Sequence, residues 1–395
     1  LLHEKPFEGV NGSGKHNNWS LVTDSGENLL DPGKTPAENT QFLVFLMAVI
    51  AAVDDYADLM RVSVASAGND HRLGANEAPP AIVSIFLGDE LTSVLKSIEE
   101  GTDFLKQKQI LMEIGAKVLP HFAKDTTDRN RTSPFAFTGN KFEFRMPGSA
   151  LSVAEPNVIL NTAVAESLSR IYEVLKDVPE EQMEEQIQEL LKSMITQHKR
   201  ILFNGNGYTD EWVEEAKKRG LFNLKSLPDA LPQFIAEKNI DLFTKHRIFT
   251  KEEIYSRYEI ILENYSKTIH IESLTMQDMV KKDFTPALFA YVSDVTKEAL
   301  DKRKLLPSLS ASYEEKIVQT LTESSEQIVL ALAALTEDTK KAEQMEEPLE
   351  TARYYHDSIL KDMDTLRASV DQAEAIIPGS YLPYPTYDEL LFSLR

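Results

Sequence analysis

Lys141-Phe142-Glu143-Phe144-Arg145 alternates charged and aromatic side chains along its whole length. Successive side chains of a β-strand point to opposite faces of the sheet, so this alternation predicts a strand. One face would carry the three charges, and the other would be buried. A carboxylate between two cations is suited to a metal ion and anionic ligands. The alternative is an exposed edge strand whose charges only form ion pairs with neighbouring strands.

A glycine-rich turn leads into a second predicted strand. Residues 11–20 read Asn-Gly-Ser-Gly-Lys-His-Asn-Asn-Trp-Ser, and strand periodicity places His16, Asn18 and Ser20 on one face. A histidine beside a turn with exposed backbone is suited to a metal and phosphate site. The spacing from Gly9 to Lys15 does not match the GxxxxGK[ST] phosphate-binding loop, and an ordinary turn is the alternative.

Two further segments combine turn residues with charges. Residues 69–80 read Asn-Asp-His-Arg-Leu-Gly-Ala-Asn-Glu-Ala-Pro-Pro, and residues 128–134 read Asp-Arg-Asn-Arg-Thr-Ser-Pro. Loops dense in charge often carry function, and arginine is suited to a bidentate grip on carboxylate or phosphate. The alternative for each arginine is a solvated surface charge.

Taken in order, these segments resemble glutamine synthetase. The motifs are NGSGKH at 11–16, RLGANEAP at 72–79, NRTSP at 130–134 and KFEFR at 141–145. The sequence of residues 3–20 and the long helical tail are most similar to the large type III form of that family. The resemblance covers residues 1 to about 150 by motif and the remainder by general character.

The resemblance implies the ligands and substrates of the site. His16 would bind a metal ion near the ATP phosphates and Glu143 one on the glutamate side, with two or three Mg²⁺ or Mn²⁺ ions per site. The residues implied for the amino-acid substrate are Asn11, Gly12, Arg72 and Arg145. Those implied for the nucleotide are Asn18, Ser20 and Lys141.

The implied reaction is the ligation of ammonia to glutamate. ATP would phosphorylate the γ-carboxylate, and ammonia would then displace phosphate from γ-glutamyl phosphate to give glutamine. Arg131 would bind the phosphate being transferred. Glu77 would take a proton from ammonia and shield the acyl phosphate from water. The alternative for Glu77 is that it only orders its own loop.

Composition is typical of a soluble cytoplasmic enzyme. The chain has no cysteine, which excludes disulfides, thiol catalysis and cysteine-ligated metals, and its net charge of -21 argues against binding to nucleic acid. The longest apolar run, residues 42–53, is too short to span a membrane. We expect it to form a buried helix that begins with Thr35 as N-cap, Pro36 at the first helical position and Glu38 at the third.

The character of the chain changes near residue 151, where strand signals give way to long helical patterns. We predict an α+β protein in which residues 1–155 form the C-terminal half of a catalytic domain built on an antiparallel sheet. Residues 156–395 would form an all-helical extension. Because the chain begins with Leu1 rather than methionine, we expect a fragment, with further metal ligands and a smaller N-terminal domain upstream.

Helical periodicity predicts two features of the second half. An amphipathic stripe runs along one helix and consists of Leu160, Val164, Leu168, Ile171 and Leu175. Apolar spacings of three and four near residues 317–335 and 359–373 predict an antiparallel helical hairpin. The histidines of this half show no metal-ligand spacing and are interpreted as ordinary residues: His198, His246, His270 and His356.

Two alternatives to the ammonia ligase stay open. An enzyme of the same fold could join a polyamine to glutamate, and a helical assembly protein could carry a decayed catalytic domain. The resemblance further implies a homo-oligomer, with a dodecamer of stacked rings as the expected form. Glutamate, ammonia and ATP would be its substrates, with neither nucleic acid nor membrane as a partner.

Overall fold

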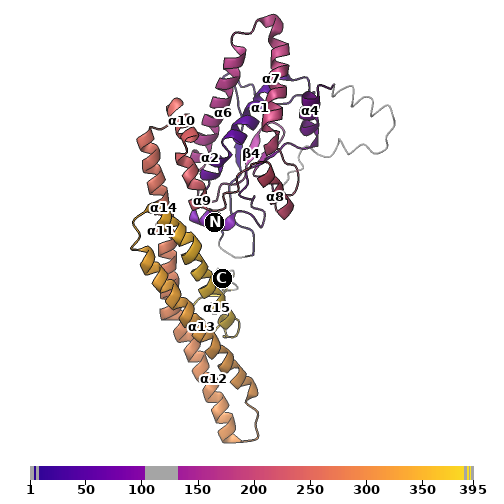
Figure 1. Ribbon diagram of the computed structural model, residues 1–395. Coiled ribbons are helices and arrows are strands. Elements are labelled where there is room, and N and C mark those ends of the chain that lie inside the picture. The colour runs from indigo at the N-terminus through magenta and orange to yellow at the C-terminus, as the bar shows by residue number, and fades with distance from the viewer. Residues whose placement is uncertain (1–3, 6–8, 103–131, 387–388, 391, 393–395) are drawn as a thin grey trace, which may run out of the picture. The chain divides into compact units, whose positions relative to one another are not determined.

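The computed structural model describes residues 4–5, 9–102, 132–386, 389–390 and 392 (Figure 1). The chain divides into two compact units, Leu1–Tyr258 and Glu259–Arg395. The predicted change of character near residue 151 comes just before the start of a long helix at Ala154, well inside the first unit. Whether that position also separates a catalytic domain from an extension stays a prediction.

The first unit contains a four-stranded sheet in the order β1-β4-β3-β2. The strands are β1 (Asn17–Trp19), β2 (Ile85–Phe86), β3 (Phe135–Phe137) and β4 (Phe142–Phe144). The α+β class is confirmed, but the expected purely antiparallel sheet is wrong in one pairing, because β2 runs parallel to β3. A parallel pair needs a long crossover, and the chain after β2 begins one with α4 (Asp89–Glu100).

The predicted strand alternation is confirmed on β4. Phe142 and Phe144 are fully buried and pack against the rings of Phe135 and Phe137 on β3. Because β4 lies between β1 and β3, the alternative of an exposed edge strand is excluded. The charged side chains of this segment therefore stand on the opposite face of an interior strand.

The apolar run forms α1 (Thr40–Asp55), a helix buried along most of its length, and its Phe42 packs against Phe137 on β3. The expected N-cap at Thr35 is wrong. Asn39 caps the helix instead, and its side chain accepts a hydrogen bond from the backbone N–H of Phe42. An Asn side chain satisfies the first free N–H groups as well as Thr does, and the residues before it close a turn of their own.

Short helices and two long ones surround the sheet in the first unit (Figure 1). The α-helices are α2 (Ala57–Val62), α3 (Ala67–Arg72), α6 (Ala154–Leu175), α7 (Met183–His198), α8 (Asp210–Lys218), α9 (Leu227–Ala230) and α10 (Glu237–Lys245). The 3₁₀ turns are η1 (Glu180–Gln182), η2 (Lys199–Ile201) and η3 (Leu231–Ile235). Both α6 and α7 pack on α1.

Helix α6 also covers the face of β1 that is turned away from the charges. The predicted stripe is largely buried at Leu160, Val164 and Ile171. Two asparagines of α6 accept from this face, because Asn17 donates to Asn157 at 2.8 Å and the Trp19 indole donates to Asn161 at 2.8 Å. These bonds fix which face of β1 is buried, and so which face is free for a site.

A buried carboxylate joins α6 to α10. Glu166 accepts from Arg170 one turn along α6 and from Lys245 and His246 at the end of α10. Burial alone would raise the pKa of Glu166, but the hydrogen bonds from Lys245, His246 and Arg170 outweigh it and lower the pKa to about 2.

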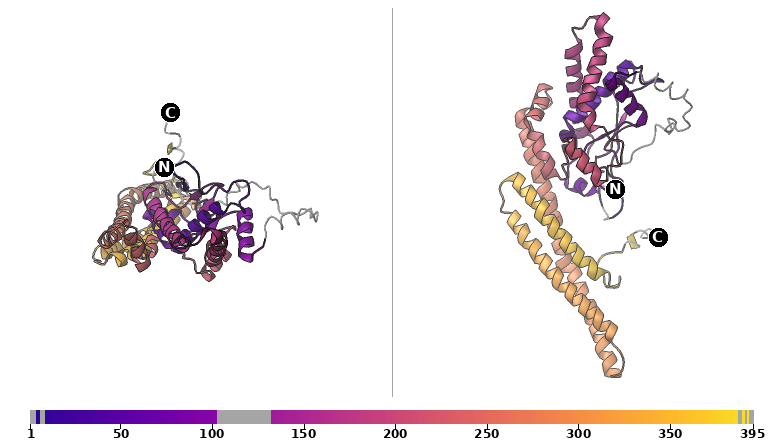
Figure 2. Two further views of the ribbon diagram at one scale, coloured as in Figure 1. Left: turned by 90° about the horizontal axis from the view of Figure 1, so that it is seen from above. Right: turned by 45° about the vertical axis from the view of Figure 1, so that its right-hand side comes forward.

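The second unit is helical. Its elements are α11 (Lys251–Met279), which begins in the first unit, the π-helical turn η4 (Val280–Phe284), α12 (Thr285–Leu305), α13 (Ser312–Ala342), α14 (Pro348–Tyr354), the π-helical turn η5 (Tyr355–Ile359) and α15 (Leu360–Glu374). The predicted hairpin is confirmed, since α13 and α15 pack along each other (Figure 2). No helix among the described residues is both long enough and apolar enough to cross a membrane.

We expect Phe144→Ala to destabilise the first unit by about 3–5 kcal/mol, because it removes a fully buried ring from the aromatic layer. Urea unfolding followed by tryptophan fluorescence would measure this, since Trp19 and Trp212 both lie in the first unit. Phe289→Ala, at an exposed position of α12, is the control and should leave the transition in place. Equal effects of the two changes would contradict the assigned core.

Stability of the first unit should depend on the charge of Glu166. Its folded pKa lies below the ordinary value, so its stabilisation is present above about pH 4.5 and is lost as the pH falls toward about 2. Glu166→Gln should lower stability near neutral pH and flatten this acid-side decline, as measured by urea unfolding across the range. Glu173→Gln, at an exposed pair with Lys176, should behave as the unmodified protein does.

Candidate active site

Strand register brings the polar residues of β1 and β4 to one face of the sheet. Asn18 lies opposite Glu143 in the β1–β4 pair, and Ala136 lies opposite Glu143 in the β3–β4 pair. His16 precedes β1 on the same side and contacts Glu143 directly. The predicted shared face is therefore confirmed, and the small side chain of Ala136 borders the carboxylate on the other flank.

Glu143 is held from two sides. Its Oε2 lies 3.0 Å from Nε and 2.9 Å from Nη2 of Arg145, and its Oε1 lies 2.9 Å from Nδ1 of His16. Burial by itself would raise the pKa of Glu143, but Arg145 and His16 together lower it. The imidazole is 52% exposed, whereas the carboxylate is 7% exposed.

Both partners of this contact, Glu143 and His16, are of a residue type that can ligate a metal ion. A carboxylate oxygen and an imidazole nitrogen are both acceptors unless the ring carries a proton there, so their approach requires a proton or a cation between them. Carboxylate oxygens and imidazole nitrogens are also both ligands of divalent metal ions in proteins. The chemistry of Glu143 and His16 thus fits divalent ions at this face, and of the two side chains the imidazole is the more exposed.

The residues expected to face a nucleotide lie at the other end of the same face. Asn18 is exposed and donates to the backbone oxygen of His16 at 3.2 Å. The Ser20 hydroxyl bonds to Asn28 at 2.7 Å and to the backbone oxygen of Asn140 at 3.0 Å. Ser20 therefore has a structural task in holding the β3–β4 turn. Lys141 closes that turn with its backbone oxygen, which accepts from Thr138.

Arg72 is buried behind the glycine turn. Its Nη1 donates to Asn69 Oδ1 at 3.2 Å and to the backbone oxygen of Met146 at 3.0 Å, and its Nη2 donates to the backbone oxygen of Arg145 at 3.2 Å. A Cβ added to Gly14 would lie 2.1 Å from Nη2, so only glycine permits this approach. The guanidinium thus orders the chain beyond β4 and supports the turn.

Glu77 lies on a tight turn beside Asn11. The Asn11 amide donates to Glu77 Oε2 at 3.1 Å, which brings the first motif and the second together. Asn76 and Glu77 adopt positive φ angles of 52° and 66°, a region that residues other than glycine seldom occupy. Glu77 itself is exposed, so its carboxylate faces solvent from a turn with positive φ angles.

The structure therefore joins two groups of predicted site residues. His16, Glu143 and Arg145 form one group, and Asn11 with Glu77 forms part of the other. Arg72 connects them through the backbone of Arg145 and through the glycine turn. Gly12 lies in that turn and packs closely on Arg72, since a Cβ there would lie 3.0 Å from Cγ of Arg72. The predicted phosphate ligand Arg131 lies outside the described residues.

Sequence reasoning missed Glu4. Its side chain is almost fully buried, its Oε1 accepts from the backbone N–H of Ala150 at 3.0 Å, and its charge attracts that of Arg72. Cβ atoms on Gly68 or Gly148 would come within 2.6 Å of the Glu4 carboxylate, so glycines make the room for it. The signal available in the sequence was these glycines, which read only as turn residues.

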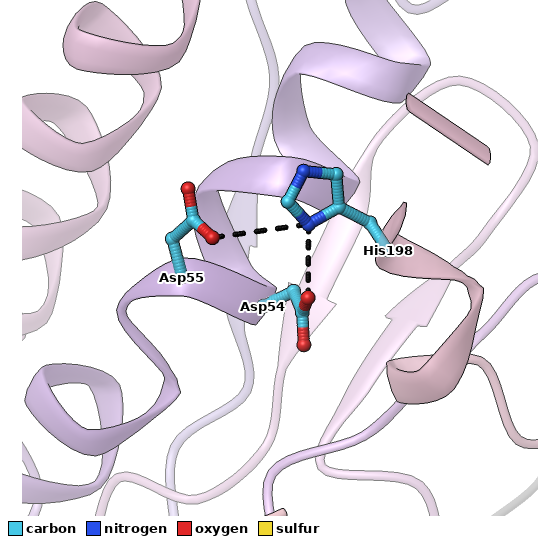
Figure 3. A group of neighbouring side chains, drawn as sticks. All are labelled: Asp54, Asp55 and His198. Atoms are coloured by element: carbon cyan, nitrogen blue, oxygen red, sulfur yellow. Dashed lines mark hydrogen bonds and ion pairs between the residues drawn. The ribbon is translucent and has the colours of Figure 1, made fainter. Parts of the chain in front are cut away.

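A second charged cluster lies where α1 ends beside the end of α7 (Figure 3). Asp54, Asp55 and His198 place potential ligand atoms within 4.8 Å of one another. Arg200 already donates to both oxygens of Asp54, at 2.8 and 3.1 Å, and Arg170 pairs with Asp55 at 2.7 Å. Because two guanidiniums neutralise the carboxylates, we interpret the cluster as an ion-pair network that joins α1 to α7.

Comparisons with known proteins agree with the motifs. Residues 186–303 match the family model of the glutamine synthetase C-terminal domain. The whole chain is 59% identical to a glutamine synthetase of Butyrivibrio fibrisolvens, of which it covers 56%. Over 99% of its length it is 44% identical to the type-3 glutamine synthetase of Dictyostelium discoideum, and over all of it 38% identical to a glutamine synthetase of Bacteroides fragilis.

The chain spans about half the length of these curated relatives, covering 56%, 54% and 55% of them. The identity extends through both compact units, so it includes the strands of the candidate site as well as the helices. Motifs, fold and relatives agree, and the chain belongs to the glutamine synthetase family in its type III form.

Proposed function

We propose that the protein ligates ammonia to the γ-carboxylate of L-glutamate at the expense of ATP, through γ-glutamyl phosphate, and releases glutamine, ADP and phosphate. The observation that carries this proposal is Glu143, a carboxylate held between Arg145 and His16 on the polar face of the sheet. The activity is that of the whole protein, because the chain spans about half of its relatives.

His16 would hold one Mg²⁺ or Mn²⁺ ion near the ATP phosphates and Glu143 another on the glutamate side, in a site with two or three ions in all. A bound divalent ion offsets the negative charge of the phosphoryl group during its transfer. Arg145 has two tasks in this proposal. It keeps Glu143 ionised and oriented, and it presents positive charge toward the substrate or its acyl phosphate.

Glutamate would lie against the glycine turn. Asn11 and Gly12 would contact the amino acid, and Arg72 would attract its carboxylate from beneath the turn. The backbone oxygens that hold Arg72 fix its guanidinium in position, so its charge would act on the substrate carboxylate without a rearrangement of the side chain. Lys141, Asn18 and Ser20 would face the nucleotide.

Glu77 would act on the ammonia. Its exposed carboxylate is aimed by Asn11 and by the unusual turn, where it could accept the proton that ammonium must lose. The same loop would keep water from the acyl phosphate. Arg131 would bind the transferred phosphate, and this part of the proposal rests on the family motif alone.

We further propose that the protein works as a homo-oligomer, with a dodecamer as the expected form, in the cytoplasm. The second unit carries large apolar side chains in exposed positions on its helices, which a second copy could cover. They include Ile271, Phe289 and Leu330.

The direct test is phosphate release from ATP by the full-length protein with Mg²⁺ and with glutamate, ammonium, both, or a polyamine in place of ammonium. Release that requires glutamate and ammonium together would support the proposal. Preference for the polyamine would replace it with a polyamine ligase, and no release from an assembled protein that binds Mg²⁺ would favour an assembly role.

Glu143→Gln in the full-length protein should reduce metal-dependent phosphate release more than about 100-fold, because loss of an outer-shell partner alone typically costs 10–100-fold. The amide keeps the size of the side chain, so the fold should persist and unfolding temperature checks this. Glu173→Gln at the protein surface is the matched control. Near-normal turnover of Glu143→Gln would remove the metal role.

Glu77→Gln should preserve ATP binding but release more phosphate for each glutamine formed, since the base is lost while the phosphorylation step is retained. The measurement is the ratio of phosphate to glutamine at saturating glutamate, with ATP affinity determined separately. Glu90→Gln, on the first turn of α4, is the control. An unchanged ratio in Glu77→Gln would limit Glu77 to ordering its own loop.

A further inference from the structure

The loop between η2 and α8 lies along the candidate site. Its residues 203–208 read Phe-Asn-Gly-Asn-Gly-Tyr, and Phe203 donates its backbone N–H to the Ile85 oxygen of β2 at 2.9 Å. The Asn204 side chain accepts from the backbone of Leu87 and donates to Thr92 at 2.9 Å. The start of this loop is thus anchored to the sheet and to α4.

The end of the loop reaches the turn that carries Glu77. The Tyr208 hydroxyl donates to the backbone oxygen of Ala78 at 2.8 Å. Next to it, Gly207 donates its N–H to the Thr132 hydroxyl at 2.8 Å. The phenol therefore bonds the backbone of the turn at the residue that follows Glu77.

The turn requires such support because of its backbone. Asn76 and Glu77 are two successive residues other than glycine at positive φ, which costs free energy at each position. Within the turn, Gly74 donates to the Pro79 oxygen at 2.9 Å and Ala78 donates to the Ala75 oxygen at 3.1 Å. Both of these bonds lie within the turn, whereas the bond from the Tyr208 hydroxyl to the Ala78 oxygen ties the turn to a distant loop.

Tyr208 remains a hydrogen-bond donor over the whole physiological range. Burial raises the pKa of its phenol, the charge of Glu77 raises it further, and Arg72 opposes this in part. The phenol thus interacts electrostatically with both residues to which the substrate and ammonia roles are proposed.

We propose that Tyr208 is a positioning residue that holds the Glu77 turn in its strained form and so sets how tightly phosphate release is coupled to glutamine formation. The proposal rests on the function proposed above. It assigns a role in the site to a loop beyond the four motifs, within the segment that matches the C-terminal domain of the family. Tyr208 acts through the backbone of Ala78, next to Glu77, without touching the substrate.

Close packing around Gly207 provides a second way to move the loop. A Cβ on Gly207 would lie 3.2 Å from the backbone oxygen of Thr132 and 3.3 Å from Cγ of Pro80. Both contacts are tighter than usual, so Gly207→Ala should displace the loop slightly and loosen the Tyr208 bonds while every site residue stays in place.

The first test is hydrogen exchange of the full-length protein, followed at the amides of residues 73–80. Tyr208→Phe removes only the hydroxyl, and we expect exchange in this segment to become about 5-fold faster, as for one lost hydrogen bond. Tyr172→Phe, at an exposed ring on α6, is the matched control and should change nothing. Exchange that is unchanged in Tyr208→Phe would overturn the proposal, whether or not the protein proves to be a ligase.

The second test is the ratio of phosphate released to glutamine formed. Tyr208→Phe and Gly207→Ala should raise this ratio severalfold and leave the KM for ATP unchanged, whereas Tyr172→Phe should retain the ratio of the unmodified enzyme. A normal ratio in an active Tyr208→Phe enzyme would overturn the coupling role. Absence of activity in the unmodified protein would instead contradict the proposed function, and the exchange result would then decide the role of Tyr208.

Discussion

The candidate site depends on the ion pair between Glu143 and Arg145, because a charge removed from water must be paired. Both side chains are almost fully buried on the polar face of an interior strand, so either one alone would be costly. Because β4 is bonded on both sides, the pair cannot shift along the sheet. His16 contacts this pair, Asn18 of β1 lies in register with Glu143, and the remaining site residues are arranged around that centre.

The second constraint is close approach of backbone to buried charge. Arg72 donates hydrogen bonds to backbone oxygens just after β4. Glu4 lies nearby and packs closely against glycines. Side chains at Gly14 or Gly148 would collide with these groups. The glycines of the first motif thus serve packing around charges, while they also leave backbone near the proposed substrate position.

Local patterns predicted local structure well. Alternation on β4, the buried stripe of α6 and the hairpin of α13 with α15 all follow from periodicity. The parallel pairing of β2 was not predicted, because strand direction depends on how a long connection returns to the sheet. The cap of α1 was misplaced, because Asn39 and Thr35 carry equivalent signals and only packing selects one of them.

By itself, the sequence determined the family motifs, the polar face of β4 and the residue types able to hold a metal ion and anions, since these depend on side-chain chemistry and a period of two. Only the tertiary structure decided that Arg72 is buried, that Glu4 is its neighbour and that Tyr208 supports the Glu77 turn. The Tyr208 hydroxyl and Ala78 are 130 residues apart in the chain. Contacts across such separations depend on how several elements pack together, and no local pattern of residues records them.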